Sequence, residues 1–415
     1  MFVLRIVLLF LITTIYPVFA GQKVVLFNDT SAWYHWGCTG TSIALKEEFQ
    51  SLGFSVQAIP INTTYALKEI PDFAQFDSLE SLNLFCSGNR EIIQAIQDAD
   101  AVVITGEGTI HDLGGGPRAL LYLAYMSKIY FGKHVEIINH SAYPKDNPQL
   151  SASFLSNFGV EKEVVDTKLK EAEAIYKSVY VVLDFVAIRE PFSHAVMKQI
   201  DVCSQLSFDC LPLYIHKHYQ QPKHITEKAI VLAGSVAHNE EGIQNICRYL
   251  EAVENRGIKI KVLIGAAAFP SKDDKKFVAL LRKYCQAAWE LVDATSMDEW
   301  LNTINNASLL VSGRFHHSIA AFCLNTPFIA LNSNTPKVHA ICALLEQPEP
   351  FLYSDPALLE SLLQRTTMIF NSPPLDNSVK AAYLRELAQK NFEGLRKLIE
   401  IPLTATLETY SPRTL

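Results

Sequence analysis

The sequence contains no CxxC pair among its eight cysteines, so it lacks the usual spacing of zinc ligands. It also has no internal repeats and no low-complexity tract, which excludes solenoid and fibrous proteins. Only 19% of the residues are charged, and 36 basic against 43 acidic residues give a net charge of −7. This balance excludes a polybasic nucleic-acid-binding protein and a disordered acidic chain. We therefore expect a folded, slightly acidic protein with no nucleic-acid partner and no metal.

Long apolar runs are absent beyond the amino terminus. Arg5 is followed by the uncharged run Ile6–Ala20, which is shorter than the ~20 residues that a membrane-spanning helix needs. Val18 and Ala20 have the spacing of a signal-peptidase site. We expect residues 1–20 to be a secretory signal peptide, with an uncleaved amino-terminal anchor as the alternative. Either one predicts an exported protein (periplasmic, secretory-lumenal or secreted), which meets a membrane only if the segment stays uncleaved.

From residue 23 onward, short β-branched runs alternate with longer amphipathic stretches, which is the pattern of parallel sheets with crossover helices. In the first half the expected strands are Lys23–Phe27, Phe54–Ile59, Ala101–Thr105, His134–Ile138 and Phe185–Ile188. In the second half they are Lys228–Ala233, Ile258–Ile264, Leu309–Ser312 and Phe328–Leu331. The main expected helices are Thr41–Leu52, Arg118–Phe131, Glu240–Val253, Asp273–Ala288, Met297–Asn305, Pro336–Leu345 and Ser378–Ile399.

The chain of 415 residues is too long for one domain of roughly 100–200 residues. The sequence predicts an α/β protein with two doubly wound Rossmann-like domains that face a cleft, as in the GT-B architecture. We expect an acceptor-side domain at 21–213, a linker at 214–225, a donor-side domain at 226–375, and a helix and tail at 376–415. Ligands of such folds bind at the carboxyl ends of the strands.

Several candidate site residues follow strands of the first half. Gly106-Glu107-Gly108 ends one strand, with His111 and Asp112 close behind, which predicts an acid/base pocket. The alternative is a glycine-rich turn whose acids cap the next helix. The segment is not the dinucleotide fingerprint, so NAD is not expected.

Arg189 and His140 each end a further strand of this half. A buried arginine needs a counter-charge, so Arg189 pairs either with an acid of the chain or with a ligand phosphate or carboxylate.

The loop after the first strand carries Asn28, Asp29, His35 and Trp36. Its aromatic rings and hydroxyl-binding groups fit a sugar, although the loop could also simply pack on the body.

Two neighbouring helix starts in the second half predict an anion site. Arg314 follows a strand and a glycine, where a helix amino terminus already favours an anion, and His316 titrates near neutral pH. Ser333, Asn334 and Lys337 follow the next strand in the same way. The alternatives are a structural Arg–His pair, a simple helix cap and a solvated lysine.

Together these segments resemble the polysaccharide pyruvyl transferase family over about residues 23–345. The most specific segments are the early N-D-T…H-W-G-C loop, T-G-E-G-T ending at Thr109, I-R-E around Arg189, S-G-R-F-H ending at His316 and S-N-T-P-K ending at Lys337. The family implies a GT-B-like fold and transfer of pyruvate from phosphoenolpyruvate to sugar hydroxyls, usually as a cyclic ketal. By this resemblance, Arg314 and His316 match the family's R-x-H motif, and Arg189 matches its R-[DE] strand end.

The predicted chemistry needs cations for the donor's phosphate and carboxylate, an acid for its methylene carbon and a base for the hydroxyl. The candidate catalytic residues are His316 as the acid, Glu107 or His140 as the base, and Arg314. The candidate donor-binding residues are Arg189, Arg314, Ser333, Asn334 and Lys337. The candidate acceptor-binding residues are Asn28, Asp29, His35, Trp36, His111 and Asp112. No cofactor is expected besides phosphoenolpyruvate as donor substrate, and the partner is a glycan or polysaccharide.

Two alternatives remain open. A GT-B glycosyltransferase would use a nucleotide sugar, with Arg314 and Lys337 on its phosphates and a slot for the base beside Gly234 and Gly265. A secreted glycan-binding protein without catalysis would bind glycans regardless of Arg314→Ala or His316→Ala. A shared fold does not decide between these three hypotheses.

Overall fold

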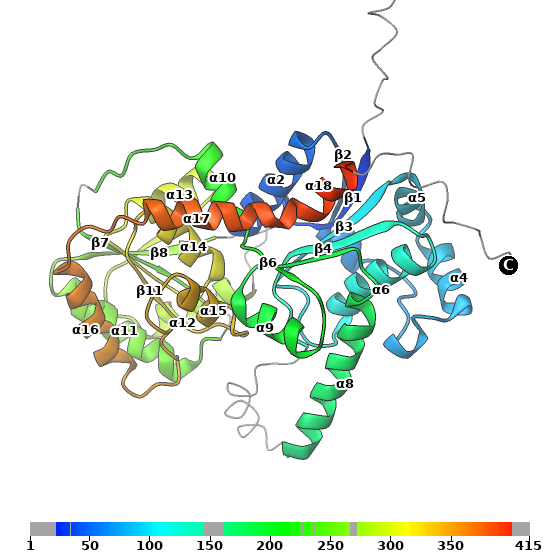
Figure 1. Ribbon diagram of the computed structural model, residues 1–415. Coiled ribbons are helices and arrows are strands. Elements are labelled where there is room, and N and C mark those ends of the chain that lie inside the picture. Colours follow the sequence, from blue (N-terminus) through cyan, green and yellow to red (C-terminus); the bar gives the residue numbers. More distant parts are fainter. Residues whose placement is uncertain are drawn as a thin grey trace, which may run out of the picture.

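Two parallel β-sheets, one in each half of the chain, form the framework of the molecule (Figure 1). The computed structural model describes residues 22–33, 35–144, 162–225, 227–235, 237–265 and 272–400. The expected signal or anchor segment at 1–20 and the tail after Glu400 lie outside these residues. In the described part of the chain, no helix is both long and apolar enough to cross a membrane. All eight cysteines are described, and all are free thiols.

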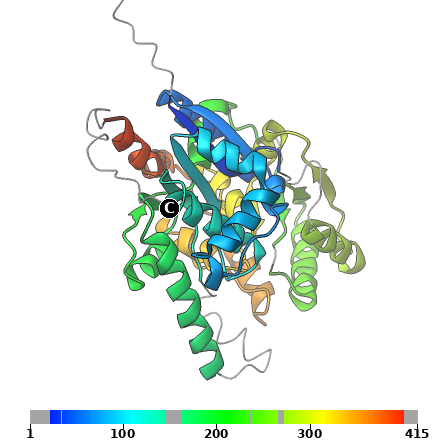
Figure 2. The same ribbon diagram turned by 90° about the vertical axis from the view of Figure 1, so that its right-hand side faces the viewer.

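In the described residues the first sheet has six parallel strands, in the order β2-β1-β3-β4-β5-β6. The strands are β1 (Lys23–Asp29), β2 (Ser55–Pro60), β3 (Ala101–Glu107), β4 (His134–His140), β5 (Phe185–Ile188) and β6 (Gln205–Leu206). The helices are α2 (Trp36–Ser51), α3 (Ile61–Tyr65), α4 (Leu79–Gly88), α5 (Arg90–Asp98), α6 (Gly115–Ile129), α8 (Lys162–Tyr180) and α9 (Pro191–Gln199), with the 3₁₀ turn η1 (Phe73–Gln75). Strands β1, β3 and β4 are buried almost throughout, because helices cover both faces of the sheet. One end of α8 points away from the body in both views (Figures 1 and 2).

The second sheet has the parallel order β11-β10-β7-β8-β9. Its strands are β7 (Ala229–Ala233), β8 (Lys259–Ile264), β9 (Glu290–Asp293), β10 (Leu309–Ser312) and β11 (Phe328–Ala330). The helices of this half are α10 (Leu211–His218), α11 (Glu240–Glu254), α12 (Lys272–Tyr284), α13 (Met297–Asn305), α14 (Phe315–Cys323), α15 (Lys337–Leu344) and α16 (Leu358–Phe370). The order of the strands reverses between β7 and β10. In a doubly wound fold, a ligand binds at the carboxyl ends of the strands beside such a reversal.

All nine expected strands exist, and two short edge strands were not expected. Strand β6 is only two residues long, and β9 is largely exposed, so neither carries an apolar signal. The expected linker at 214–225 also differs, because α10 continues to His218. Leu211 and Ile215 of α10 are buried in the core of the second half, and this packing keeps the polar segment helical.

The expected helix Ser378–Ile399 is α17 (Ser378–Gln389), the 3₁₀ turn η2 (Lys390–Phe392) and α18 (Glu393–Glu400). This carboxyl-terminal segment, red in Figure 1, crosses both halves. Helix α17 packs on α10 and α14, whereas η2 contacts β5 and β6 of the first sheet. The segment therefore ties the two domains together.

Asn391 in η2 is the polar anchor of this crossing segment. Its side chain is fully buried, and its Oδ1 accepts hydrogen bonds from the Asn139 N–H (2.8 Å) and the Ser207 hydroxyl (3.1 Å). Its Nδ2 donates to the carbonyls of Phe208 (2.8 Å) and Ala388 (2.9 Å). One amide thus satisfies main-chain groups at the ends of β4 and β6.

Replacing Asn391 by alanine is expected to lower the free energy of unfolding by about 2–4 kcal/mol, because buried main-chain groups at Asn139 and Phe208 lose their partners. Urea unfolding followed by circular dichroism measures this loss. Asn371→Ala changes an exposed residue after α16 and is expected to shift stability by less than about 0.5 kcal/mol. Equal stability of the two variants would contradict the anchoring role of Asn391.

Candidate functional site

A cavity of about 710 Å³ lies where the carboxyl ends of the two sheets face each other. The first half contributes the starts of α2 and α6, the end of β3 and Arg189 after β5. The second half contributes Gly265 and the starts of α14 and α15. Most candidate residues from the sequence line this cavity: His35, Trp36, Glu107, His111, Asp112, Arg189, Arg314, His316, Ser333 and Lys337.

Arg189 is a cavity residue that also has an internal partner. Its side chain is 2% exposed, and Nη1 donates to Asp209 Oδ2 at 2.8 Å. Its Nε donates to the Ser141 hydroxyl at 3.1 Å, and the guanidinium lies 4.4 Å from the centroid of the Phe315 ring. The two alternatives for this residue therefore combine, since an acid of the chain holds Arg189 while the other edge of its guanidinium faces the cavity.

Arg314 and Lys337 stand at the starts of neighbouring helices, as the sequence predicts. Arg314 is the amino-terminal cap residue of α14 and forms a salt bridge with Asp274 of α12. Lys337 is the first residue of α15. Burial, together with the charges of Arg189 and Arg314, lowers the pKa of Lys337 to about 8. Three cationic side chains therefore border this part of the cavity, two of them paired with buried acids.

Gly108 lies in the cavity wall close to two of these cations, Lys337 and Arg189. A Cβ atom built on Gly108 would lie 3.2 Å from Lys337 Nζ and 3.4 Å from Arg189 Nη2. The two nitrogens, which belong to different domains, therefore face the same small volume beside the β3–α6 loop. A bidentate anion at that volume could contact both.

Asp209 organises the opposite side of the site. This fully buried carboxylate accepts from Arg189 through Oδ2, which also lies 3.2 Å from His316 Nε2. Its Oδ1 accepts from the Thr41 hydroxyl (2.8 Å) and the Leu211 N–H (2.9 Å). Burial alone would raise the pKa of Asp209, but His316 and Arg189 outweigh burial and hold it well below its ordinary value. Asp209 therefore stays ionised and orients the His316 ring.

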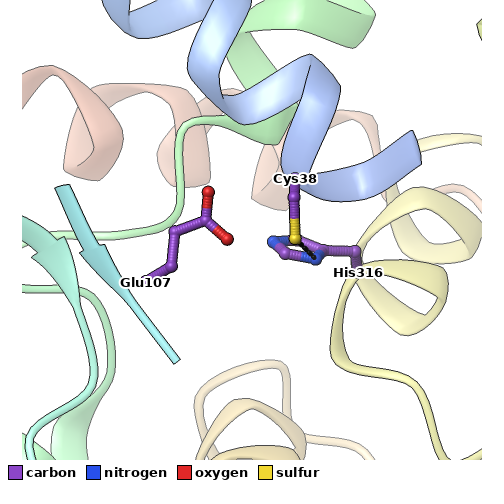
Figure 3. Close-up of side chains that lie close together, drawn as sticks. All are labelled: Cys38, Glu107 and His316. Atoms are coloured by element: carbon purple, nitrogen blue, oxygen red, sulfur yellow. Dashed lines mark hydrogen bonds between the residues drawn. The ribbon is translucent and has the colours of Figure 1, made fainter. Parts of the chain in front are cut away.

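Cys38, Glu107 and His316 form a cluster in which three side chains from three elements point toward one another (Figure 3). Cys38 lies in the first turn of α2, and its Sγ is 3.8 Å from His316 Nδ1. Cys38 Sγ and a Glu107 carboxylate oxygen lie within 4.8 Å of each other, and Glu107 accepts from the Thr30 hydroxyl at 2.6 Å. Burial and the Glu107 carboxylate raise the pKa of the Cys38 thiol well above its ordinary value. The thiol is therefore protonated at neutral pH.

Gly37 makes this cluster possible. A Cβ atom at this position would lie 2.1 Å from His316 Cβ, so any side chain would push α14 away from α2. The start of α2 is held on the second half by two further bonds. The Trp36 N–H donates to the Gly265 carbonyl at 3.0 Å, and its indole donates to the Ala294 carbonyl at 2.9 Å. Cys38 and His316 thus meet across a tight contact between the two halves.

The ligand atoms of Cys38, Glu107 and His316 lie within 4.8 Å of one another, and in the described part of the chain they are the one group of this kind that could hold a metal ion. Charges of both signs surround these atoms, because Arg189 and Lys337 lie near them and Arg189 is itself paired with Asp209.

The first-half wall of the cavity is aromatic and polar. Trp33, Trp36 and Tyr65 line it, together with His111 and Asp112. His111 Nδ1 lies 3.6 Å from Asp112 Oδ2, and Asp112 Oδ1 accepts from the Gly114 N–H at 2.6 Å. This wall presents rings and hydrogen-bonding groups, which is the chemistry that a sugar needs.

Two further histidines of the cavity, His35 and His317, are neutral. Burial, followed by the charges of Arg314 and His316, lowers the pKa of His35 well below its ordinary value. The same causes lower the pKa of His317, whose Nε2 accepts from the Trp300 indole at 3.1 Å. Both rings can therefore hydrogen-bond a ligand but add no positive charge.

Four candidate residues lie away from the cavity. Asn28 is fully buried and donates to the Thr105 carbonyl at 2.7 Å, and the Asp29 carboxylate lies 3.4 Å from Lys46 Nζ. Asn334 is exposed and accepts from the Ser333 hydroxyl. These side chains shape the loops that carry neighbouring site residues.

His140, the fourth, is enclosed at the end of β4. Its Nδ1 lies 3.0 Å from the Ala187 carbonyl, and its Nε2 lies 3.0 Å from the Tyr180 hydroxyl. Burial lowers the pKa of His140 to about 3, so the ring stays neutral. Because both nitrogens have partners inside the core, the geometry does not support the hypothesis that His140 is a base for a substrate hydroxyl.

Sequence reasoning missed Asp209 and Cys38. Asp209 follows β6, a strand too short to leave a pattern, although an acid inside the apolar run Phe208–Leu213 is a signal of a buried charge. Cys38 stands in the H-W-G-C segment that the sequence singled out, but a lone cysteine gives no sign of its distant partners.

Comparisons with known proteins place this geometry in context. The family model for polysaccharide pyruvyl transferase matches residues 41–335. No similar sequence is found among curated proteins.

Solved structures resemble the whole fold. The UDP-GlcNAc 2-epimerase of Neisseria meningitidis, bound to UDP-GlcNAc, is 12% identical with a TM-score of 0.54, over 92% of this chain and 100% of that one. The UDP-GlcNAc 2-epimerase of Methanocaldococcus jannaschii is 12% identical with a TM-score of 0.53, over 92% and 99% of the two chains. At this identity the likeness shows the fold alone, and it confirms the predicted GT-B-like pair of α/β domains.

The matched residues run from the first turns of α2 to the loop before α15 and so include most of the cavity wall. Because this match spans well over half of the chain, the protein belongs to the polysaccharide pyruvyl transferase family and is a polysaccharide-modifying transferase.

Proposed function

We propose that this transferase moves a pyruvyl group from phosphoenolpyruvate to hydroxyls of a glycan and closes it to a cyclic ketal. The observation that carries the proposal is the convergence of Arg189, Arg314 and Lys337 on one cavity that also holds Glu107 and His316. Phosphoenolpyruvate has two anionic groups on a three-carbon enol, so it needs several cations and little apolar surface.

The volume beside Gly108 suits one of the donor's anionic groups, because Arg189 Nη2 and Lys337 Nζ both face it. The starts of α14 and α15 add main-chain N–H groups and the positive ends of two helix dipoles. Arg314 lines the same wall from the second domain.

The remaining cavity fits the acceptor. A volume of about 710 Å³ exceeds what a three-carbon donor needs and leaves room for a sugar ring against Trp33, Tyr65 and the His111–Asp112 turn. The aromatic faces would stack on the ring while the polar groups bind its hydroxyls. The acceptor therefore enters from the first-domain side.

The chemistry takes place between these two regions. Protonation of the donor's methylene carbon makes C2 electrophilic, and an acceptor hydroxyl bonds to C2 as it loses its proton. We assign that proton to Glu107 and place the acid in the Cys38–His316 group. Phosphate then leaves C2 with the C2–O electron pair, the second hydroxyl bonds to C2, and the proton of this hydroxyl goes to the departing phosphate as the ketal closes.

The nucleotide-sugar alternative finds less support. It needs space for a base beside Gly234 and Gly265, but Phe277 packs on Gly234, 3.1 Å from the position of a Cβ atom. The same position on Gly265 lies 3.1 Å from the His317 ring and 3.6 Å from the Trp300 indole nitrogen. Core side chains thus lie in the Cβ direction of both glycines, although Gly265 also lines the cavity.

The expected signal segment has a consequence for the donor. If the protein is exported, phosphoenolpyruvate must be delivered to the exported compartment. We propose export as the localisation, and no bound cofactor besides the donor substrate.

Phosphoenolpyruvate is expected to raise the melting midpoint of the chain from Gly21 onward. A ligand at a hundred times its dissociation constant adds about 2.7 kcal/mol to the native state. Differential scanning fluorimetry measures the shift, and Lys337→Met is expected to abolish most of it. Lys198→Met, an exposed lysine on α9, is the matched control and should keep the shift. If a nucleotide sugar alone stabilises the protein, the donor assignment is wrong.

The affinity for phosphoenolpyruvate is expected to fall above about pH 8, because Lys337 loses its proton there in the free protein. A bound anion favours the ammonium and raises its pKa, so binding takes up a proton. The dissociation constant should rise by up to about tenfold per pH unit above that point. Titration calorimetry in two buffers of different ionisation enthalpy measures both effects.

Lys337→Arg provides the control for this pH profile. A guanidinium stays charged throughout the range, so the rise should flatten even if the affinity changes. An unchanged rise in this variant would show that another group titrates.

A further inference from the structure

The contacts of His316 limit how it can deliver a proton. Its Nε2 lies 3.2 Å from Asp209 Oδ2, and its Nδ1 lies 3.8 Å from Cys38 Sγ. Both ring nitrogens are thus directed at side chains of the protein. The side chain nearest to Nδ1, the nitrogen that is not paired with Asp209, is therefore the Cys38 thiol.

The Cys38 thiol has the position that such a transfer needs. It lines the donor cavity in the first turn of α2, with His316 on one side and Glu107 on the other (Figure 3). Arg189, which faces the proposed donor, lies close enough for its charge to act on the thiol. The thiol is therefore next to the place where the enol would lie.

The resting protonation state also suits a donor of protons. Burial and the Glu107 carboxylate keep the thiol protonated, in contrast to a nucleophilic cysteine, whose pKa is lowered. When the thiol gives up its proton, the His316–Asp209 pair can stabilise the thiolate. This arrangement is consistent with a Cys38 thiol that gives up its proton and is then protonated again.

We propose that Cys38 is the acid that protonates the methylene carbon of the donor, with Glu107 as the base that recharges it; this inference rests on the proposed function. The thiol S–H bond breaks as the C2–C3 double-bond electrons take its proton at C3 and form a methyl group. The acceptor oxygen bonds to C2, and its proton goes to Glu107. Glu107 then returns that proton to the Cys38 thiolate, so the enzyme is unchanged and no oxidant or cofactor is needed. His316 acts as a positioning residue.

Deuterium exchange tests the acid directly. Wild type, Cys38→Ala and Cys203→Ala are incubated with phosphoenolpyruvate in deuterated water, with a panel of methyl hexopyranosides as acceptors. Nuclear magnetic resonance follows deuterium in the three-carbon unit of the product and of recovered donor. Cys38→Ala is expected to lose about 10²- to 10⁴-fold in the rate of incorporation, the usual contribution of a general acid. Cys203 is exposed, so its replacement should have no effect.

Donor binding is measured in the same variants to separate the role of Cys38 from the assignment of phosphoenolpyruvate as the donor. The melting shift with phosphoenolpyruvate should persist in Cys38→Ala, because Arg189 and Lys337 are unchanged. A shift in wild type with equal exchange rates in wild type and Cys38→Ala overturns the role of Cys38 but leaves the donor assignment intact. If the wild type shows no shift, the proposed function itself fails, and this inference fails with it.

Thiol labelling gives a readout that does not depend on turnover. Saturating phosphoenolpyruvate should slow the reaction of Cys38 with N-ethylmaleimide, relative to Cys203 in the same sample, as mass spectrometry of the labelled peptides would show. Equal labelling of Cys38 with and without bound donor would place the thiol away from the enol. A stoichiometric metal in the wild type that is lost in Cys38→Ala would also overturn the proposal, because the thiol would then be a ligand.

Discussion

The buried carboxylate of Asp209 is the constraint on which the site depends. A charge with no exposed surface is stable only when hydrogen bonds and opposite charges surround it, and Asp209 has four such partners: Arg189, His316, Thr41 and the Leu211 N–H. Two of them, Arg189 and His316, come from different domains. Satisfying one acid therefore fixes the Arg189 guanidinium and the His316 imidazole in a single geometry.

The fold could be predicted because its signal is local. Strands such as Ala101–Glu107 are buried over their whole length and begin with an apolar run, since helices cover both faces, and the bounds of β5 agree with the sequence prediction to the residue. The departures have physical causes that lie outside any local window. Helix α10 continues through a polar segment because Leu211 and Ile215 have a core to pack on.

The site could be predicted best where its residues stand at or shortly after strand ends. Glu107 ends β3, Arg189 follows β5 and Arg314 comes two residues after β10, and parallel topology brings such positions to one edge. His140 also ends a strand, but its imidazole points into the core, where its two nitrogens contact the Ala187 carbonyl and the Tyr180 hydroxyl. Sequence shows that a residue ends a strand, whereas the direction of its side chain depends on the neighbouring strand.

The contact between the domains makes catalysis depend on their packing. Cys38 belongs to the first domain and His316 to the second, and only a glycine at position 37 lets α2 and α14 approach closely enough for their 3.8 Å contact. The carboxyl-terminal segment that Asn391 anchors spans the same two domains from the other side. Because both domains contribute to the cations and to the Cys38–Glu107–His316 cluster, the proposed donor binding and proton transfer require the domains to stay packed.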